Sequence, residues 1–322
     1  MTNKGVSVII CCFNSAFRLP KTLQHIALQQ TSISWEVIVV NNNSSDNTRQ
    51  VAVAEWARMG VLIPFKVVDE PKPGLASARS KGIDTAQYDY LVFCDDDNWL
   101  APNYVENVYE LFEKDDNIGI IGGNGSPVTE IEPPFWFEKF IHGYGAFPQS
   151  DKSQFVGSVY GAGMAVRKKC YENQFESLLT GRKGASLSAG EDSEMCFQVR
   201  LAGYTIWYDE RLKFKHFIPK NRLDWAYLKK LHIGFAKSSI ILDLYEKVIN
   251  EQKISTFYWL KKALYYLGIY IKYWPTQYKI YSKGVGSIEE IHHNNWSAIG
   301  FEYFRYNFKI VGFYKEINKL KI

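Results

Sequence analysis

The chain has 322 residues, of which 46% are hydrophobic and 22% are charged. This length allows one large or two modest domains, and the composition is typical of a folded soluble protein, which excludes a disordered chain. The net charge of +4 is unevenly divided. Residues 1–210 hold 18 Lys and Arg against 26 Asp and Glu, whereas residues 211–322 hold 20 against 8. We expect a folded front part and a basic rear part that meets something anionic or simply presents a solvated basic face.

The first 125 residues alternate between strand and helix patterns. Strands are expected at 6–12, 35–40, 61–70, 88–94 and 118–123, with helices between them at 18–30, 47–60, 74–86 and 102–115. Such alternation predicts βαβ units around a mainly parallel central sheet. Ligands of such sheets bind beyond the carboxyl ends of the strands.

The pattern changes in the second half of the chain. Residues 158–170 resemble a strand turning into a helix, 191–204 are expected to form a helix, and 205–217 one or two strands. Long helical patterns dominate from Asn221 onward. The predicted organisation is therefore an α/β domain at 1–220 and a helical, basic, aromatic-rich region at 221–322.

Cysteine usage and the apolar runs bear on location. Five cysteines without a CxxC spacing argue against a disulfide framework or a zinc site and fit a reducing cytosol. The apolar run near the N-terminus is too short for a signal peptide, and lysines interrupt the longest apolar stretch, Phe257 to Trp274. We expect a cytoplasmic protein.

Three consecutive carboxylates, Asp95, Asp96 and Asp97, follow the strand expected at 88–94. Oxygen ligands at a strand end suit Mg²⁺ or Mn²⁺, which also bridge to substrate phosphates. Side chains alternate along a strand, so Asp95 and Asp97 would lean one way and Asp96 the other. Taken alone, the run could equally be an acidic turn before a helix.

Other motifs change that balance. Residues 37–48 contain the end of the second strand and the polar turn that follows it. Residues 72–82, after the third strand, contain a glycine and an arginine. Within residues 190–219, a Glu-Asp pair comes before a late histidine. With this ordered set, residues 5–220 resemble the family 2 glycosyltransferases, which are inverting enzymes of the GT-A fold.

The resemblance implies roles for individual residues. In the nucleotide-sugar site it places Cys11, Cys12, Asn14, Asn41, Arg79, Asp95 and Asp96. Asn41 stands where the family usually has an aspartate, so it can accept a hydrogen bond but brings no charge. For the metal, Mn²⁺ or Mg²⁺, it implies Asp95, Asp97 and His216.

The acceptor side follows from the same resemblance. Asp192 is the implied general base, with Glu191 beside it to position the acceptor or the helix. Trp136 is a candidate for lining the acceptor pocket, because aromatic faces stack on sugars, although a core role is equally compatible with its position.

The main functional hypothesis is inverting transfer of a sugar from a nucleotide-diphosphate donor to an acceptor hydroxyl, in bacterial cell-surface glycan synthesis. Two alternatives belong to other classes. An aspartyl-phosphate phosphatase would need its nucleophilic aspartate after the first strand, where this chain has "CCFNSA". A non-catalytic sugar-nucleotide or glycan-binding protein would tolerate Asn41 but would need no base.

The C-terminal region interleaves lysines with aromatic residues, as in 256–283. That pattern is typical of a helix lying on an anionic membrane surface, and it also fits an oligomer interface. Acceptors of such transferases are commonly lipid-linked, so the expected partners are a glycan or lipid-linked acceptor and the inner face of the cell membrane. Nucleic acid is not expected, because the front part is acidic.

Overall fold

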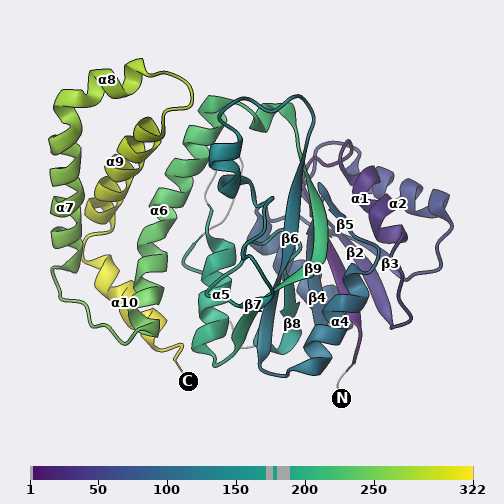
Figure 1. Ribbon diagram of the computed structural model, residues 1–322. Coiled ribbons are helices and arrows are strands. Elements are labelled where there is room, and N and C mark those ends of the chain that lie inside the picture. The colour runs from purple at the N-terminus through teal and green to yellow at the C-terminus, as the bar shows by residue number, and fades with distance from the viewer. Residues whose placement is uncertain (1–2, 172–176, 180–188, 322) are drawn as a thin grey trace. The chain divides into compact units, whose positions relative to one another are not determined.

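The computed structural model describes residues 3–171, 177–179 and 189–321 (Figure 1). Its segments form two compact units. The first, here called the sheet unit, comprises residues 1–130, 144–174 and 203–218. The second, the helical unit, comprises residues 131–143, 175–202 and 219–322.

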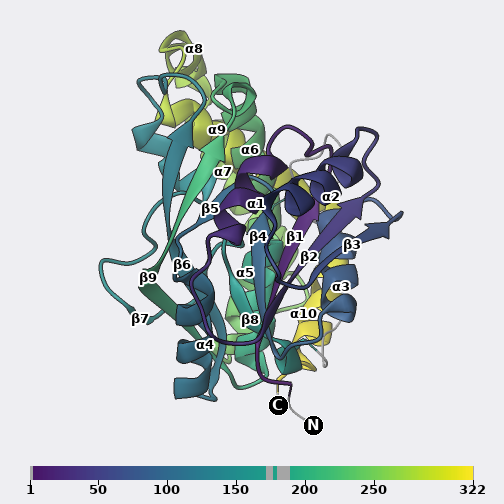
Figure 2. The same cartoon turned by 90° about the vertical axis from the view of Figure 1, so that its right-hand side faces the viewer.

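The sheet unit is built on a nine-stranded sheet with the order β3-β2-β1-β4-β8-β6-β9-β5, in which β7 pairs with β9. Pairing is parallel from β3 to β4, and β8 is antiparallel to both of its neighbours. Figure 2 shows the parallel strands β1 to β4 after a turn of the view in Figure 1 about its vertical axis. The strands are β1 (Val6–Cys12), β2 (Trp35–Asn42), β3 (Phe65–Glu70), β4 (Tyr90–Asp95), β5 (Asn98–Leu100), β6 (Ile118–Thr129), β7 (Gln154–Phe155), β8 (Ala165–Arg167) and β9 (Thr205–Ile218).

Four helices flank the parallel strands: α1 (Leu19–Ala27), α2 (Thr48–Met59), α3 (Leu75–Thr85) and α4 (Tyr104–Lys114). In α1, Leu19, Leu23 and Ile26 repeat at helical spacing and are fully buried, so one face joins the core. In α3, a Cβ on Gly82 would lie 2.4 Å from Ile9 Cγ2 of β1. Only glycine therefore lets α3 approach the sheet this closely.

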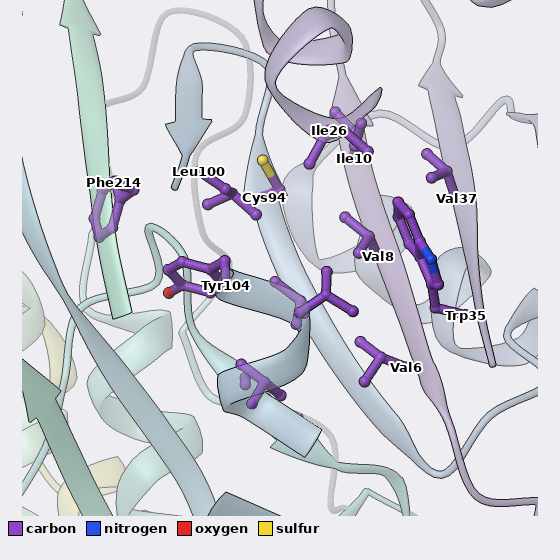
Figure 3. Packing of buried hydrophobic residues seen from close by; sticks show 14 of the residues in the cluster. Val6, Val8, Ile10, Ile26, Trp35, Val37, Cys94, Leu100, Tyr104 and Phe214 are labelled. Atoms are coloured by element: carbon purple, nitrogen blue, oxygen red, sulfur yellow. The ribbon is translucent and has the colours of Figure 1, made fainter. Parts of the chain in front are cut away.

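The core of the sheet unit lies around the central strands. Val6, Val8 and Ile10 alternate along β1 with no exposure, and they share one cluster with Tyr104 of α4 and Phe214 of β9 (Figure 3). Burial of both faces explains why β1 reads as an almost continuous apolar run. The core therefore fixes the strands whose ends carry the acidic run.

The helical unit contains α5 (Glu191–Leu201), α6 (Trp225–Ile249), α7 (Tyr258–Tyr273), α8 (Gln277–Ser282), α9 (Ile288–Tyr306) and α10 (Lys309–Asn318). Side chains cap two of them, because Asp224 accepts from the Ala226 N–H and Ser287 from the Glu290 N–H. Helices α7 and α6 both pack on α9, and α10 packs on α6 (Figure 1). A second core, with Ile240, Leu244, Tyr303 and Ile310 among its members, joins these helices.

The sequence predictions are confirmed for the α/β class and the five N-terminal strands, with differences at their ends. The third strand begins at Phe65 rather than at residue 61, because residues 61–64 are irregular, with a bend at Ile63. The fifth extends to Thr129, and residues 205–218 form one strand, β9. In 158–170 the strand is only Ala165–Arg167, and a 3₁₀ turn, Lys168–Cys170, replaces the expected helix. Within the described residues, no helix combines the length and apolar character needed to cross a bilayer.

Candidate functional site

The carboxyl ends of three neighbouring parallel strands bring predicted site residues together. Cys11 of β1 lies opposite Asp95 of β4, and Cys12 lies opposite Asn41 of β2. Burial raises the pKa of the Cys11 thiol to about 12, so this cysteine is neutral at physiological pH. The two cysteines therefore serve as uncharged, small side chains at this edge rather than as nucleophiles.

The loop after β1 is tied to the loop after β2. Asn14 adopts a positive φ of 49°, its Oδ1 accepts from the Ser45 N–H at 2.8 Å, and its own N–H donates to Ser44 Oγ at 3.1 Å. Ser15 N–H donates to Thr48 Oγ1 at 2.8 Å. Asparagine tolerates this backbone conformation better than most residues, so Asn14 has a structural role in shaping the loop.

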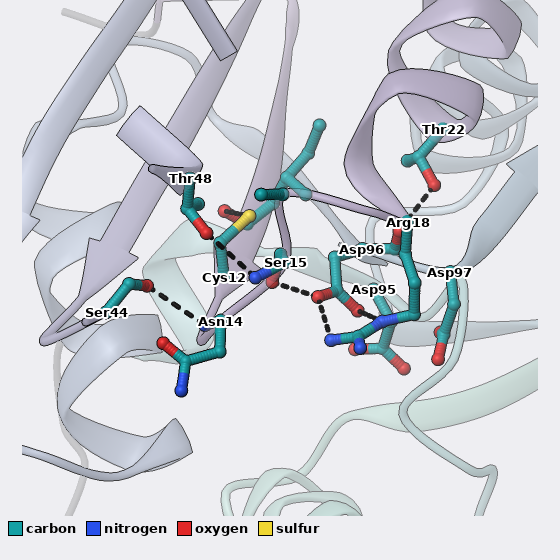
Figure 4. A network of polar contacts seen from close by, with 12 residues as sticks. Cys12, Asn14, Ser15, Arg18, Thr22, Ser44, Thr48, Asp95, Asp96 and Asp97 are labelled. Carbon is teal, nitrogen blue, oxygen red and sulfur yellow. Dashed lines mark hydrogen bonds and ion pairs between the residues drawn. The ribbon is translucent and has the colours of Figure 1, made fainter. Parts of the chain in front are cut away.

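Asp96 is the member of the acidic run that holds the fold together (Figure 4). Its carboxylate accepts from Arg18 Nη2 at 2.6 Å and Nε at 3.3 Å, and also from Ser15 Oγ. Its backbone carbonyl accepts from Thr22 Oγ1 at 2.8 Å. Burial and the charge of Asp97 raise the pKa of Asp96, whereas Arg18 and Ser15 oppose that rise. Asp96 thus links the β4 end to the loop before α1.

Asp97 forms a buried pair with His216. The Asp97 Oδ1 and His216 Nε2 atoms lie 3.4 Å apart, and the residues are only 2% and 7% exposed. Strand pairing fixes them, since Asn98 of β5 lies opposite His216 of β9 and the Phe217 N–H donates to the Asp97 carbonyl at 2.8 Å. His216 Nδ1 lies 3.5 Å from the Gly145 carbonyl, which can only accept, so this contact favours the tautomer with its proton on Nδ1.

Asp97 and His216 carry atoms that suit two of the ligand positions of a divalent cation. A carboxylate oxygen and an imidazole nitrogen are both ligands of Mn²⁺, and Mg²⁺ usually takes only one or two carboxylates and completes its shell with waters and substrate phosphates. Among residues 3–171, 177–179 and 189–321, no three His, Cys, Asp or Glu side chains are grouped to hold an ion. Asp95, at the end of β4, is therefore not gathered with Asp97 and His216 into a three-residue set.

Asn41 has a charged neighbour that the sequence analysis missed. Asn41 Nδ2 donates to Asp69 Oδ1 at 2.9 Å, because Asn41 of β2 lies opposite Asp69 of β3. Arg49 Nη1 donates to the other Asp69 oxygen at 2.9 Å. The Asn41 Oδ1 atom is buried and has no hydrogen-bond partner in the described part of the chain. The Asp69 carboxylate and the unsatisfied Asn41 Oδ1 atom therefore lie on neighbouring residues at the ends of β2 and β3.

Arg79 lies on α3 and is 3% exposed. Its guanidinium carbon lies 5.1 Å from the centre of the Phe93 ring, a cation–π distance. Burial raises the pKa of the nearby Tyr171, and the positive charge of Arg79 opposes that rise. Arg79 thus places a buried cation in the sheet unit.

In the helical unit, Glu191 and Asp192 begin α5. Gly190 precedes them with a φ of 102°, and a Cβ there would lie 3.1 Å from the Cβ of Ser238. The first turn therefore starts from a backbone shape that favours glycine. Carboxylates at this end are stabilised in their ionised form by the helix dipole.

Glu194, two residues further on, was not identified from the sequence. Its buried carboxylate accepts from the N–H groups of Leu178 and Leu179 at 2.9 and 3.1 Å and from Tyr245 Oη at 3.0 Å, and it also accepts from Ser177 Oγ. It fixes the first turns of α5 against α6 and against residues 177–179. The "EDSE" sequence alone gives no signal of which carboxylate points inward.

Trp136 is 3% exposed and packs edge-on against Trp225, with a centroid distance of 5.4 Å. Phe140 packs edge-on against the same ring. The ring of Trp136 therefore belongs to the packing of the helical unit, which favours the core role of the two that its position allowed.

Solved structures support the fold. S. aureus TarS residues 1–349 in complex with UDP matches 98% of this chain and 90% of its own length, with a TM-score of 0.51 and 13% identity. The corresponding complex with UDP-GlcNAc gives a TM-score of 0.54 at the same coverage and 13% identity. GalNAc-T7 with UDP, GalNAc and Mn²⁺ covers 73% of this chain and 50% of that chain, with a TM-score of 0.54 and 15% identity. The GT-A fold predicted from the sequence is confirmed.

Curated relatives match over shorter stretches. The putative glycosyltransferase EpsH of Bacillus subtilis (strain 168) is 32% identical over 108 residues, which are 34% of this chain and 30% of the relative. The poly-beta-1,6-N-acetyl-D-glucosamine synthase of Staphylococcus epidermidis is 30% identical over 122 residues, which are 38% of this chain and 28% of the relative. The match thus spans less than a third of either relative. The family model described as glycosyl transferase family 2 matches residues 7–175, more than half of the chain, and the chain therefore belongs to glycosyl transferase family 2.

Proposed function

We propose that this chain transfers a sugar from a nucleotide-diphosphate donor to an acceptor hydroxyl with inversion, in the synthesis of a bacterial surface polysaccharide. The observation that carries the proposal is the buried Asp97–His216 pair at the carboxyl edge of a parallel sheet. Membership of the family and the polysaccharide synthase among the relatives support it. Cys11, Cys12, Asn14 and Arg79 would shape the donor site.

Donor recognition would use Asn41 and Asp69. The buried, unsatisfied Asn41 Oδ1 can accept a hydrogen bond from a base N–H or a ribose hydroxyl, and its amide already donates to Asp69. Asp69 would then supply the carboxylate that Asn41 lacks. Because the TarS complexes contain UDP and UDP-GlcNAc, uridine donors are the first to test.

Asp97 and His216 would hold Mn²⁺ or Mg²⁺, with Asp95 on the nucleotide side. When bound, the ion would neutralise charge on the leaving diphosphate. The chain's own contribution is to fix the two ligands: β5–β9 pairing and the Phe217 N–H hold Asp97, and the Gly145 carbonyl orients the His216 ring. Asp96 and Arg18 keep the preceding loop in place.

Asp192 would act as general base on the acceptor hydroxyl, with Glu191 positioning the acceptor. The start of α5 favours the ionised carboxylate that a base requires. Residues 1–220 would form the catalytic domain, and residues 221–322 a helical, basic and aromatic-rich C-terminal region. The acceptor would be a glycan or a lipid-linked glycan, with the protein held peripherally on the inner face of the membrane.

The experiment is a screen of nucleotide sugars for metal-dependent turnover. Donor hydrolysis and transfer are measured with Mn²⁺, with Mg²⁺ and with EDTA, first for UDP sugars. Asp192→Asn keeps the shape and should bind donor normally while turnover falls about 10²–10⁴-fold. Turnover that is unaffected by EDTA, or an Asp192→Asn variant of near-normal rate, would contradict the proposal. Tight donor binding without turnover in any condition would instead favour the sugar-nucleotide-binding alternative.

A further inference from the structure

Helix α7 has apolar residues on two opposite faces. One face packs on α9: Tyr266 stacks on Tyr303 and Tyr270 stacks on His293, with ring centroids 6.2 and 4.6 Å apart. Trp259, on the same face, packs edge-on against Phe304. This face is explained by the core of the helical unit.

The other face is exposed to solvent. Leu264, Tyr265 and Ile271 follow helical spacing and are 54%, 62% and 59% exposed. After the end of α7, Trp274, whose ring packs edge-on against Tyr270, is 57% exposed, and Tyr278 of α8 is 85% exposed. We call this set, together with Lys261, Lys272 and Lys279, the aromatic–lysine surface. Packing within the helical unit gives no reason for so many large apolar side chains here.

The charge of this segment has one sign. Between Glu251 and Glu289 the sequence contains six lysines and no acidic residue. Lys262 reaches Asp243 at 3.6 Å, and Lys283 pairs with Glu289. Lys261, Lys272 and Lys279 form no ion pair with any residue that the structure describes. The surface therefore offers unneutralised cations beside exposed aromatic rings.

We propose that the aromatic–lysine surface binds an anionic lipid bilayer. Tyr and Trp rings are favoured at the headgroup level, where one end of the ring is apolar and the other is wet, and lysines nearby are attracted to anionic lipids. A second copy of the chain fits less well. A two-fold interface sets the same patch against itself, so the three lysines of the surface would face the same three lysines with no acidic residue among them.

This inference is independent of the proposed transfer reaction, because it concerns only binding. The full chain is sedimented with phosphatidylcholine vesicles and with vesicles that also contain phosphatidylglycerol. Binding should require the anionic lipid and fall as NaCl is raised, because salt screens the attraction. Lys272→Glu combined with Lys279→Glu should lower the partition coefficient at least about tenfold, since each basic residue near the surface contributes roughly fivefold. Leu264→Gln combined with Ile271→Gln should weaken binding as well.

The matched control is Lys114→Glu combined with Lys152→Glu, which makes the same charge change at exposed lysines of the sheet unit. This control should bind like the wild type. Equal binding to neutral and anionic vesicles, no binding to either, or equal losses in both lysine pairs would overturn the proposal. If the chain instead forms a dimer, binds no vesicles, and loses the dimer when Leu264→Gln is combined with Ile271→Gln, then the partner of this surface is a second copy of the chain and not a bilayer.

Discussion

Asp96→Asn should destabilise the protein while leaving Asp97 and His216, the residues that we propose as metal ligands, unchanged. In the wild type, the Asp96 carboxylate accepts two hydrogen bonds from Arg18 and one from Ser15, and Asp96 is 7% exposed. Asparagine keeps the shape but removes the negative charge that faces the Arg18 guanidinium. Breaking a buried pair in this way costs about 3–5 kcal/mol. Because the Arg18 side chain is 23% exposed, water recovers part of that loss, and we expect about 2–3 kcal/mol.

Thermal unfolding followed by circular dichroism measures the effect. A loss of that size lowers Tm by roughly 4–12 °C for a domain of 150–250 residues. The control is Asp151→Asn, which makes the same change at an exposed residue of the sheet unit and should cost less than about 0.5 kcal/mol. If Asp96→Asn melts within about 1 °C of the wild type, or no lower than Asp151→Asn, the assignment of Asp96 to the fold is wrong.

Two further predictions concern residues that the structure added. Asp69→Asn should weaken donor affinity about tenfold, as measured by calorimetry, which is the scale of one hydrogen bond to a charged group. The control, Glu110→Gln at an exposed site, should leave donor affinity unchanged. If Asp69→Asn binds the donor as tightly as the wild type does, Asp69 is not part of the donor site. Glu194→Gln should lower Tm, because an amide cannot accept from all four donors around the carboxylate. Burial raises the pKa of Glu194 above its usual 4.5, so its contribution to stability is greatest below pH 4.5 and declines as the pH rises through the raised value. The wild type's advantage over Glu194→Gln should therefore be larger at pH 4 than at pH 7.5, and a constant difference would contradict this reasoning.

Sequence periodicity predicted the parallel strands well because burial on both faces leaves an unmistakable apolar run, as in Val6–Cys12. The pairing of Asp97 with His216 was also anticipated, although from family resemblance rather than from spacing. The short strand Asn98–Leu100 was missed, since three residues carry no periodicity and depend on pairing with β9. The observed ends of the strands differ from the predicted ends because hydrogen bonds to strands distant in sequence decide where pairing stops.

Contacts between distant residues were the least predictable part of the candidate site. Arg18 and Asp96 are 78 positions apart, and nothing near either residue indicates its partner. Asp69 could have been found by aligning the ends of the predicted strands, because it stands opposite Asn41 in a parallel register. The inward direction of Glu194 depends on Tyr245, which lies on another helix.

The loop between β1 and α1 is held by hydrogen bonds to neighbouring segments. Asn14 bonds to the loop after β2, Ser15 to Thr48 at the start of α2, and Arg18 to Asp96, which follows β4. A ligand meeting such a loop pays little conformational entropy to order it, so more of its contact energy is available as affinity. Donor binding should therefore have the calorimetric signature of a rigid receptor, with a heat capacity change set by the ligand's own buried surface rather than by folding of the loop.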